Sequence, residues 1–263
     1  MNAPHVHVPY PMVGDYLPFI REHALNLEIY FSSAVLDALD PTDILKLIGT
    51  LEHHPSISIH APFMDMSPGA VDSKIRTVTF ERFSSVMEIA RSILPKVVVF
   101  HSGYEKWKYA HRVDIWLEAS LLTWKPIVEE AAVIGTRIAI ENIFEDEPSN
   151  LRSLAQELSS EHFGICFDTG HCNLFSTVPL GIWLESLSEH IFELHLHDND
   201  KSFDQHLPIG DGTFDFRTLF SHVGKKECLY TVEARSPENV MKSIERLKEY
   251  LELSPMVSKR KSP

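Results

Sequence analysis

Short runs of hydrophobic and β-branched residues recur along the chain, and longer amphipathic stretches separate them. Several of these runs are hydrophobic almost throughout, which is typical of parallel strands that are buried on both faces. Eight runs predict strands, at 5–9, 27–31, 56–62, 96–102, 137–143, 163–168, 191–197 and 229–234. Helical periodicity or a helix-start signal predicts helices at 73–94, 114–135, 149–159 and 237–252.

This alternation of strands and helices predicts a (β/α)8 TIM barrel that forms a single domain over residues 1–253. The length of 263 residues agrees, because one such barrel needs about 250. An open doubly wound sheet is the alternative, but no GxGxxG follows the first strand and GxxxxGK[ST] is absent. Residues 254–263, SPMVSKRKSP, predict a flexible basic C-terminal tail.

The net charge and the hydrophobic runs limit the partners and the cellular location that the sequence predicts. The formal net charge of −13 makes duplex DNA an unlikely partner, because non-specific DNA binding depends on basic side chains that neutralise phosphates. The N-terminal sequence has no signal-peptide pattern, and no apolar run reaches the roughly 20 residues that span a membrane. These features predict a cytoplasmic protein with a small-molecule substrate and no membrane association. The oligomeric state does not follow from the sequence.

Histidines and carboxylates collect where the predicted strands end, which is where barrel enzymes carry their chemistry. One such residue alone is more often a core or loop residue, but six consecutive strands each deliver one, which favours a shared site. The strand-end set is His60, His101, Glu141, Asp168, His195 and Glu233, and His171, Asp204 and His206 follow in loops. Imidazole and carboxylate ligands suit Zn²⁺, Mn²⁺ or Fe²⁺, and nine of them predict two or three ions per chain.

Other polar residues carry weaker expectations. Tyr104, Asn142, His197 and Lys201 are weak candidates for contacts with substrate. His5 and His7, in the first predicted strand, receive no role.

The motifs around these residues resemble a known family. They are HAPF with His60, FHSGY with His101, IENI with Glu141, CFDTGH with Asp168 and His171, HLHD with His195, DQH with Asp204 and His206, and TVEA with Glu233. In this order the chain resembles the xylose isomerase-like TIM barrels and, within them, the endonuclease IV group (AP endonuclease family 2). The resemblance implies that all nine residues bind metal, as they do around three zinc ions in endonuclease IV.

Two enzyme functions follow from this resemblance. The first is a hydrolase that cleaves a phosphoester or phosphodiester bond at a di- or trinuclear metal site, with Glu141 and Glu233 as catalytic bridging residues. Its substrate would be a small molecule, because the loop after His60 has little basic character and the segment between His195 and Asp204 is shorter than in endonuclease IV.

The alternative is a mononuclear sugar or sugar-phosphate isomerase or epimerase, since HLHDND…HLPIGDGTFDF is similar to a sugar-phosphate branch of the superfamily. There Glu141, Asp168, His195 and Glu233 would hold one ion, and the two glutamates would move a proton on and off carbon. A barrel that only binds, with a vestigial site, ranks lowest, because decay would have removed at least one ligand.

Overall fold

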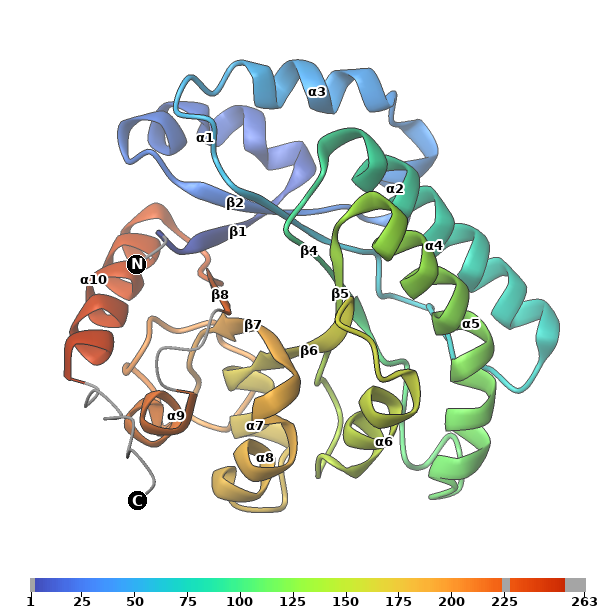
Figure 1. The fold of residues 1–263 in the computed structure, drawn as a ribbon. Coiled ribbons are helices and arrows are strands. Elements are labelled where there is room, and N and C mark those ends of the chain that lie inside the picture. The colour runs from blue at the N-terminus through green and yellow to red at the C-terminus, as the bar shows by residue number, and fades with distance from the viewer. Residues whose placement is uncertain (1–2, 224–227, 254–263) are drawn as a thin grey trace, which may run out of the picture.

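The eight strands form a closed parallel barrel in which each strand pairs with the next and β8 pairs with β1 (Figure 1). In the computed structural model, residues 3–223 and 228–253 are described. The strands are β1 (His5–Pro9), β2 (Asn26–Tyr30), β3 (Ile57–His60), β4 (Val97–His101), β5 (Arg137–Glu141), β6 (Phe163–Asp168), β7 (Ile191–Leu196) and β8 (Leu229–Val232). The predicted TIM barrel is therefore confirmed, with each predicted strand within three residues of the observed ends.

Helices surround the barrel on the outside, as Figure 1 shows. They are α1 (Tyr10–Glu22), α2 (Ser33–Ala38), α3 (Pro41–Gly49), α4 (Ser73–Ile93), α5 (Val113–Ile134), α6 (Ser149–Leu158), α7 (Thr169–Phe175), α8 (Leu180–Leu187), α9 (Phe216–Val223) and α10 (Pro237–Leu253), with a 3-10 turn at Ser188–His190. Helix α5 continues through Pro126 as one helix. The predicted basic tail at 254–263 lies outside the described residues.

The main core lies between the barrel and its helices. Large aromatic side chains fill it, and Phe83 of α4 stacks against Trp124 of α5 while both contact Phe100 of β4. All three are fully buried, and full burial of such a side chain stabilises the fold by about 1.5–3 kcal/mol. The strand residues whose side chains point outward into this layer are therefore hydrophobic.

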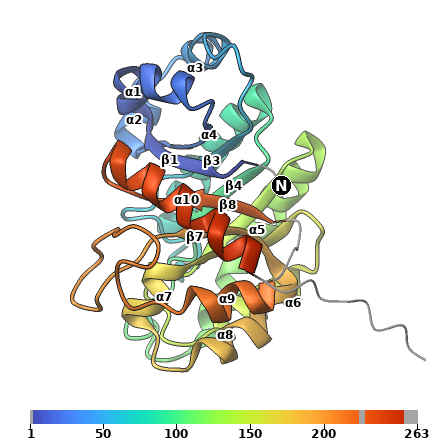
Figure 2. The ribbon, with the colours of Figure 1, turned by 90° about the vertical axis from the view of Figure 1, so that its left-hand side faces the viewer.

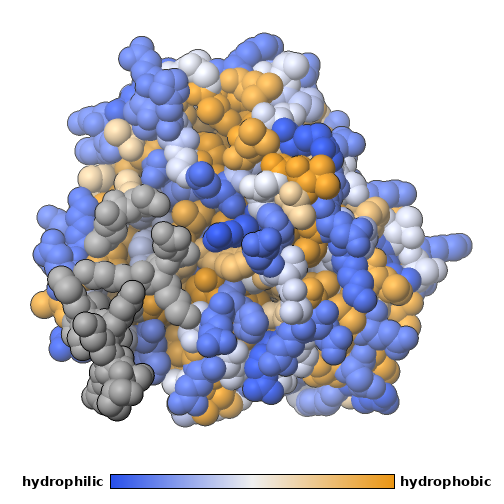
Figure 3. Space-filling model, viewed as in Figure 1, coloured by the Kyte–Doolittle hydropathy of each residue, from blue (hydrophilic) through white to orange (hydrophobic). Residues whose placement is uncertain are grey.

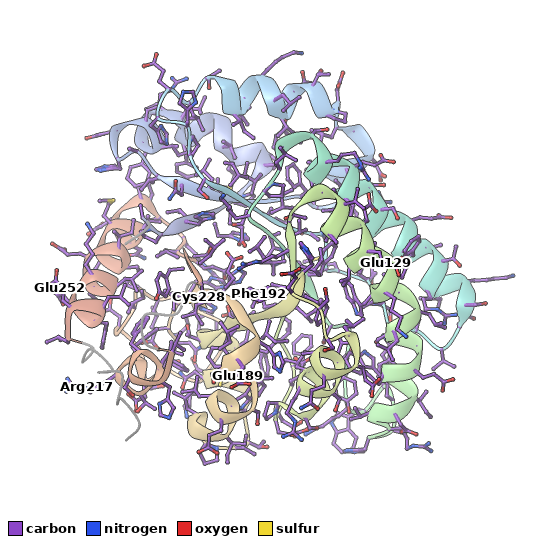
Figure 4. The ribbon with its side chains drawn as sticks, in the orientation of Figure 1. Glu129, Glu189, Phe192, Arg217, Cys228 and Glu252 are labelled. Carbon is purple, nitrogen blue, oxygen red and sulfur yellow. The ribbon has the colours of Figure 1, made fainter. Side chains whose placement is uncertain are left out.

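The barrel interior changes character along its axis. At the N-terminal end it is apolar, where Phe192 and Leu229 pack against Val97, Val99, Ala139 and Cys166. Phe192 lies near the middle of the barrel in the view of Figure 4. Its ring requires Gly164, because a Cβ at that position would lie 2.6 Å from the phenyl ring. The apolar layer closes this end of the barrel, so the polar groups lie further along the axis.

A buried polar layer follows on one side of the interior. His5 pairs with Ser58, with His5 Nδ1 2.8 Å from Ser58 Oγ, and Thr231 donates a hydrogen bond to Glu193. Glu28 belongs to the same layer and is fully buried. Beyond it lie the C-terminal ends of the strands, from which the β7–α9 segment (residues 197–215) extends at the left of Figure 2. Figure 3 shows the face seen in Figure 1, where hydrophilic residues form most of the outer rim.

Candidate metal centre

The nine residues predicted as metal ligands meet at the C-terminal ends of the strands. His60, His101, Glu141, Asp168 and His195 lie on β3, β4, β5, β6 and β7, Glu233 follows β8 directly, His171 belongs to α7, and Asp204 and His206 come from the β7–α9 segment. Seven of them line a cavity of about 1040 Å³. The other two, Asp168 and His195, lie fully buried in the same constellation. The fold therefore brings together side chains that are up to 173 positions apart in the sequence, from His60 to Glu233.

One group of ligand atoms forms around Glu141. Its Oε2 lies 3.0 Å from His60 Nε2 and 3.2 Å from His101 Nε2. Its other oxygen, Oε1, lies 3.0 Å from His171 Nδ1. Both oxygens of one buried carboxylate thus face imidazole nitrogens, which is the arrangement of a carboxylate that can bridge two cations.

The centre of the constellation is His195 Nδ1. This buried nitrogen has no hydrogen-bond partner among the described residues. Three carboxylates nevertheless surround it, with Glu233 Oε1 at 3.2 Å, Glu141 Oε2 at 3.6 Å and Asp168 Oδ2 at 3.9 Å. A buried polar atom without a partner is costly, so its place among three carboxylates fits a divalent cation held by four ligands.

A third group lies at the mouth of the cavity. Asp204 Oδ2 is 2.8 Å from His206 Nε2 and 3.8 Å from His171 Nε2. His206 has a φ of 51°, a left-handed conformation that is uncommon for a residue with a side chain. Asp204 Oδ1 is buried and has no hydrogen-bond partner in the described chain. Like His195 Nδ1, Asp204 Oδ1 is thus a buried candidate ligand atom that a bound cation would satisfy.

The electrostatics of the centre keep its carboxylates charged. Burial raises the pKa of Glu233, but the positive charges of His195 and His7 outweigh it and bring this pKa down to about 2. The same balance of burial against His195 and His101 holds the pKa of Glu141 well below its usual value. Burial lowers the pKa of His195, but carboxylates including Glu28 and Glu233 raise it well above its ordinary value. The buried carboxylates thus stabilise positive charge next to them, on an imidazole or on a bound cation.

Two residues to which the sequence assigned no role support the centre. Glu28 Oε2 lies 3.1 Å from His195 Nε2, so the carboxylate accepts the ring proton there and leaves Nδ1 free for a metal. Glu28 Oε1 lies 2.8 Å from His7 Nδ1, which is also 3.3 Å from Glu233 Oε1. His7 thus belongs to the site, which corrects the expectation that it has no role. The sequence signal that could have pointed to these two residues is the alternation of polar and apolar residues in HVHVP and LEIYF.

The four weak candidates for substrate contacts fall into different places. Tyr104 lines the cavity and stacks on Tyr109. Asn142 does not line it, since its side chain bonds both the backbone N–H and the carbonyl of Asp168. Lys201 is exposed and does not line this cavity. The Asn142 side chain therefore fixes the backbone of Asp168, a candidate ligand, and lies outside the cavity lining that its expected contact with substrate requires.

His197, the fourth, lies within the centre. It is fully buried and stacks on His206 with 4.1 Å between ring centroids. Its Nε2 lies 3.0 Å from Asp168 Oδ2, while its Nδ1 has no hydrogen-bond partner in the described residues. Gly170 makes room for the ring, because a Cβ there would lie 2.0 Å from it. His197 therefore supports Asp168 and is a tenth potential ligand, and it does not line the cavity.

Fold and site together define a TIM barrel with a buried histidine and carboxylate centre at the C-terminal ends of its strands. The family model described as xylose isomerase-like TIM barrel matches residues 27–250. The chain therefore belongs to this family, and the resemblance read from the motifs is confirmed.

Known proteins share this architecture over most of their length. The chain is 30% identical to the uncharacterized protein MJ1311 of Methanocaldococcus jannaschii, over 82% of this chain and 77% of that one. It is 28% identical to a D-tagatose 3-epimerase-like protein, with a TM-score of 0.80 over 95% of this chain and 97% of the other. The fold also matches the IOLI protein, solved with a bound zinc atom, with 13% identity, a TM-score of 0.74 and coverage of 96% and 99%.

Across the described residues, no helix has the length and apolar character needed to cross a membrane.

Proposed function

We propose that this protein is a metal-dependent isomerase or epimerase of a sugar or a related polyhydroxy carbonyl compound. One divalent ion would be held by Glu141, Asp168, His195 and Glu233. The observation that carries the proposal is His195 Nδ1, which is buried, has no hydrogen-bond partner in the part of the chain that the structure describes, and lies among three carboxylates. Similarity to an epimerase-like protein favours this chemistry over the phosphoester hydrolase that the sequence ranked first.

Each residue of the centre has a distinct task in such a reaction. A bound divalent ion supplies polarisation of a substrate carbonyl or hydroxyl oxygen, which acidifies the neighbouring C–H. Glu141 and Glu233 have lowered pKa values and so are ionised and able to accept a proton from carbon. One of them would remove the proton from carbon. The other would first take up a proton from water, and its return of that proton on the opposite face would invert the stereocentre. Glu28 holds His195 in one tautomer.

The cavity suits a neutral polyhydroxy substrate. Its lining includes the aromatic residues Tyr30 and Phe63, which can pack on the C–H faces of a sugar. The rim carries three acidic residues outside the centre, Asp65, Asp72 and Glu105, against Lys108 as the one lysine or arginine of the described lining. An acidic rim disfavours a phosphorylated substrate by charge repulsion. We therefore favour a free sugar over a sugar phosphate.

A phosphoester hydrolase with two or three ions is the second candidate. The observation that favours it is the pair of further ligand groups, one around Glu141 with His60 and His101, and the other around Asp204 with His171 and His206. A mononuclear isomerase needs neither group as metal ligands. In the isomerase Glu141 would remain a ligand of the single ion. The other members of the two groups would bind substrate hydroxyls, since histidine and carboxylate groups both hydrogen-bond to hydroxyls.

His206→Ala separates the two functions, with His222→Ala as the matched control, because His222 is exposed on α9. Metal content per chain, conversion of a panel of ketoses and hydrolysis of a panel of model phosphodiesters are measured for each protein. The isomerase keeps one tightly bound ion in His206→Ala and loses mainly substrate affinity, seen as a raised KM. Phosphodiester turnover that needs two or more ions and disappears in His206→Ala, without ketose conversion, would refute the isomerase.

A further inference from the structure

The barrel wall opens beside the metal centre, between its first and last strands. β1 and β8 are paired at only two positions, His5 with Thr231 and Val6 with Val232, whereas β1 and β2 are paired at five. Beyond Val232 the chain bonds to the other neighbour, since Glu233 N–H donates to Leu196 O. The last part of β1, up to Pro9, therefore has no strand partner on this side.

A second cavity, of about 310 Å³, occupies this opening, and we call it the seam cavity. Its walls come from β1, β2 and the two helices α1 and α10, which lie side by side across the seam in Figures 1 and 2. The walls are mostly apolar, and include Val8, Met12, Ile20, Leu25, Leu27 and Val240. An apolar cavity of 150 Å³ is enough to hold benzene, so this space can hold an aryl group or a short alkyl chain.

The seam cavity adjoins the cavity of the candidate metal centre. His7, Pro9, His206 and Glu233 line both cavities. Two of the polar residues on its lining are engaged locally, because Arg235 donates to Asp204 O and Ser236 Oγ accepts from Asn239 N–H. A molecule whose polar end lies on Glu233 and His206 can thus extend an apolar group directly into the seam.

We propose that the seam cavity is a substrate subsite that binds an apolar alkyl or aryl substituent of the sugar bound at the metal centre. This inference rests on the proposed function and makes it more specific, because it assigns the substrate to sugar derivatives that keep a carbonyl group and also carry an apolar group, such as alkyl or aryl glycosides with a keto group on the ring. Simple glycosides have no carbonyl and therefore serve only as binding probes for the subsite. The apolar substituent is transferred from water into the seam cavity, while the sugar hydroxyls remain among the histidines and carboxylates.

The test uses the full chain loaded with Mn²⁺, and calorimetry with toluene, methyl β-D-glucoside and hexyl β-D-glucoside. Each buried methylene strengthens binding roughly fourfold, so a hexyl group that buries three methylenes should bind about 60-fold more tightly than methyl. Val240→Phe places a phenyl ring in the wall of the seam cavity and should weaken both toluene binding and the hexyl preference while affinity for the methyl glucoside is kept. Ala234→Leu, at the half-buried edge of the cavity, repeats the test if Val240→Phe does not fold.

The matched control is Val133→Phe, because Val133 is 77% exposed on α5 and lines neither cavity. It should keep toluene binding and the hexyl preference. Absence of toluene binding to the unmodified protein, or equal affinity for the two glucosides, overturns the inference. If ketoses are converted in that case, the proposed function survives without the subsite. If toluene binds but neither glucoside binds and no ketose is converted, the proposed function has failed and the inference fails with it.

Discussion

Glu193 offers a test of the buried polar layer beneath the metal centre. Its carboxyl is fully buried on β7, where Oε1 accepts a hydrogen bond from Thr231 and Oε2 has no partner among the described residues. Burial, and then the negative charge of Glu28, raise the pKa of Glu193 to about 8. The folded protein therefore keeps a proton on Glu193 at neutral pH, whereas the unfolded chain ionises near its ordinary value of 4.5.

The sign and the size of the effect follow from this difference. The contribution of Glu193 to stability is fully present below pH 4.5 and is lost as the pH rises through about 8. Within that window the free energy of unfolding falls by about 1.4 kcal/mol per pH unit. Glu193→Gln keeps a neutral side chain of the same shape at every pH. The free energy of unfolding of this variant, relative to that of the unmodified protein, should therefore rise by about 3 kcal/mol over the two pH units from 5.5 to 7.5.

Urea unfolding of the metal-free protein at several pH values measures this gain, with the free energy taken from the linear dependence on urea. Metal is removed because a cation two residues away at His195 would change the charge balance. Glu157→Gln is the control, because Glu157 is exposed on α6, and the stability of this variant should follow that of the unmodified protein. A difference between Glu193→Gln and the unmodified protein that stays constant from pH 5.5 to 7.5 would show that Glu193 is ionised in the fold.

Three further perturbations test the centre itself. Glu28→Gln removes the carboxylate that orients His195 and should weaken Mn²⁺ binding by about 10–100-fold in calorimetry; unchanged affinity would contradict this role. Gly170→Ala places a Cβ 2.0 Å from the His197 ring and should cost about 1–3 kcal/mol in urea unfolding, whereas Gly181→Ala on α8, with open space around it, should not destabilise. Chelation of bound metal should lower Tm, because binding at 1,000 times Kd adds about 4 kcal/mol; a Tm that EDTA leaves unchanged would argue against a tightly bound ion.

The sequence predicts the barrel well because its signals are local. Parallel strands buried on both faces leave continuous apolar runs, and eight of them alternate with amphipathic helices. The meeting of the nine candidate ligands is predictable for a related reason, since the C-terminal ends of barrel strands meet at one rim. Chain direction and strand order alone place Glu141 near His101, without any knowledge of side-chain contacts.

His7 and Glu28 were not predicted because their role depends on register across strands. β1 and β2 pair so that His7 lies opposite Glu28, and a shift of one residue would turn one of these side chains away from the barrel interior. The local pattern HVHVP is consistent with polar residues on either face of the strand. Only the closed barrel, in which β8 lies next to β1, brings His7 within 3.3 Å of Glu233. Long-range closure, which leaves no local signal, decides this contact.

The sequence analysis ranked the hydrolase first, whereas similarity to an epimerase-like protein favours the isomerase, and this difference has a separate reason. A count of ligands favours several ions, but the same count includes residues that a mononuclear site can use for its substrate. The geometry separates them by burial, because His195 and Asp168 are fully buried whereas His206 and Asp204 line the open cavity. A cation at the buried position satisfies His195 Nδ1, whose nearest groups are three carboxylates. Side chains that line the cavity can bind sugar hydroxyls as well as a cation, so the number of candidate ligands does not by itself give the number of bound ions.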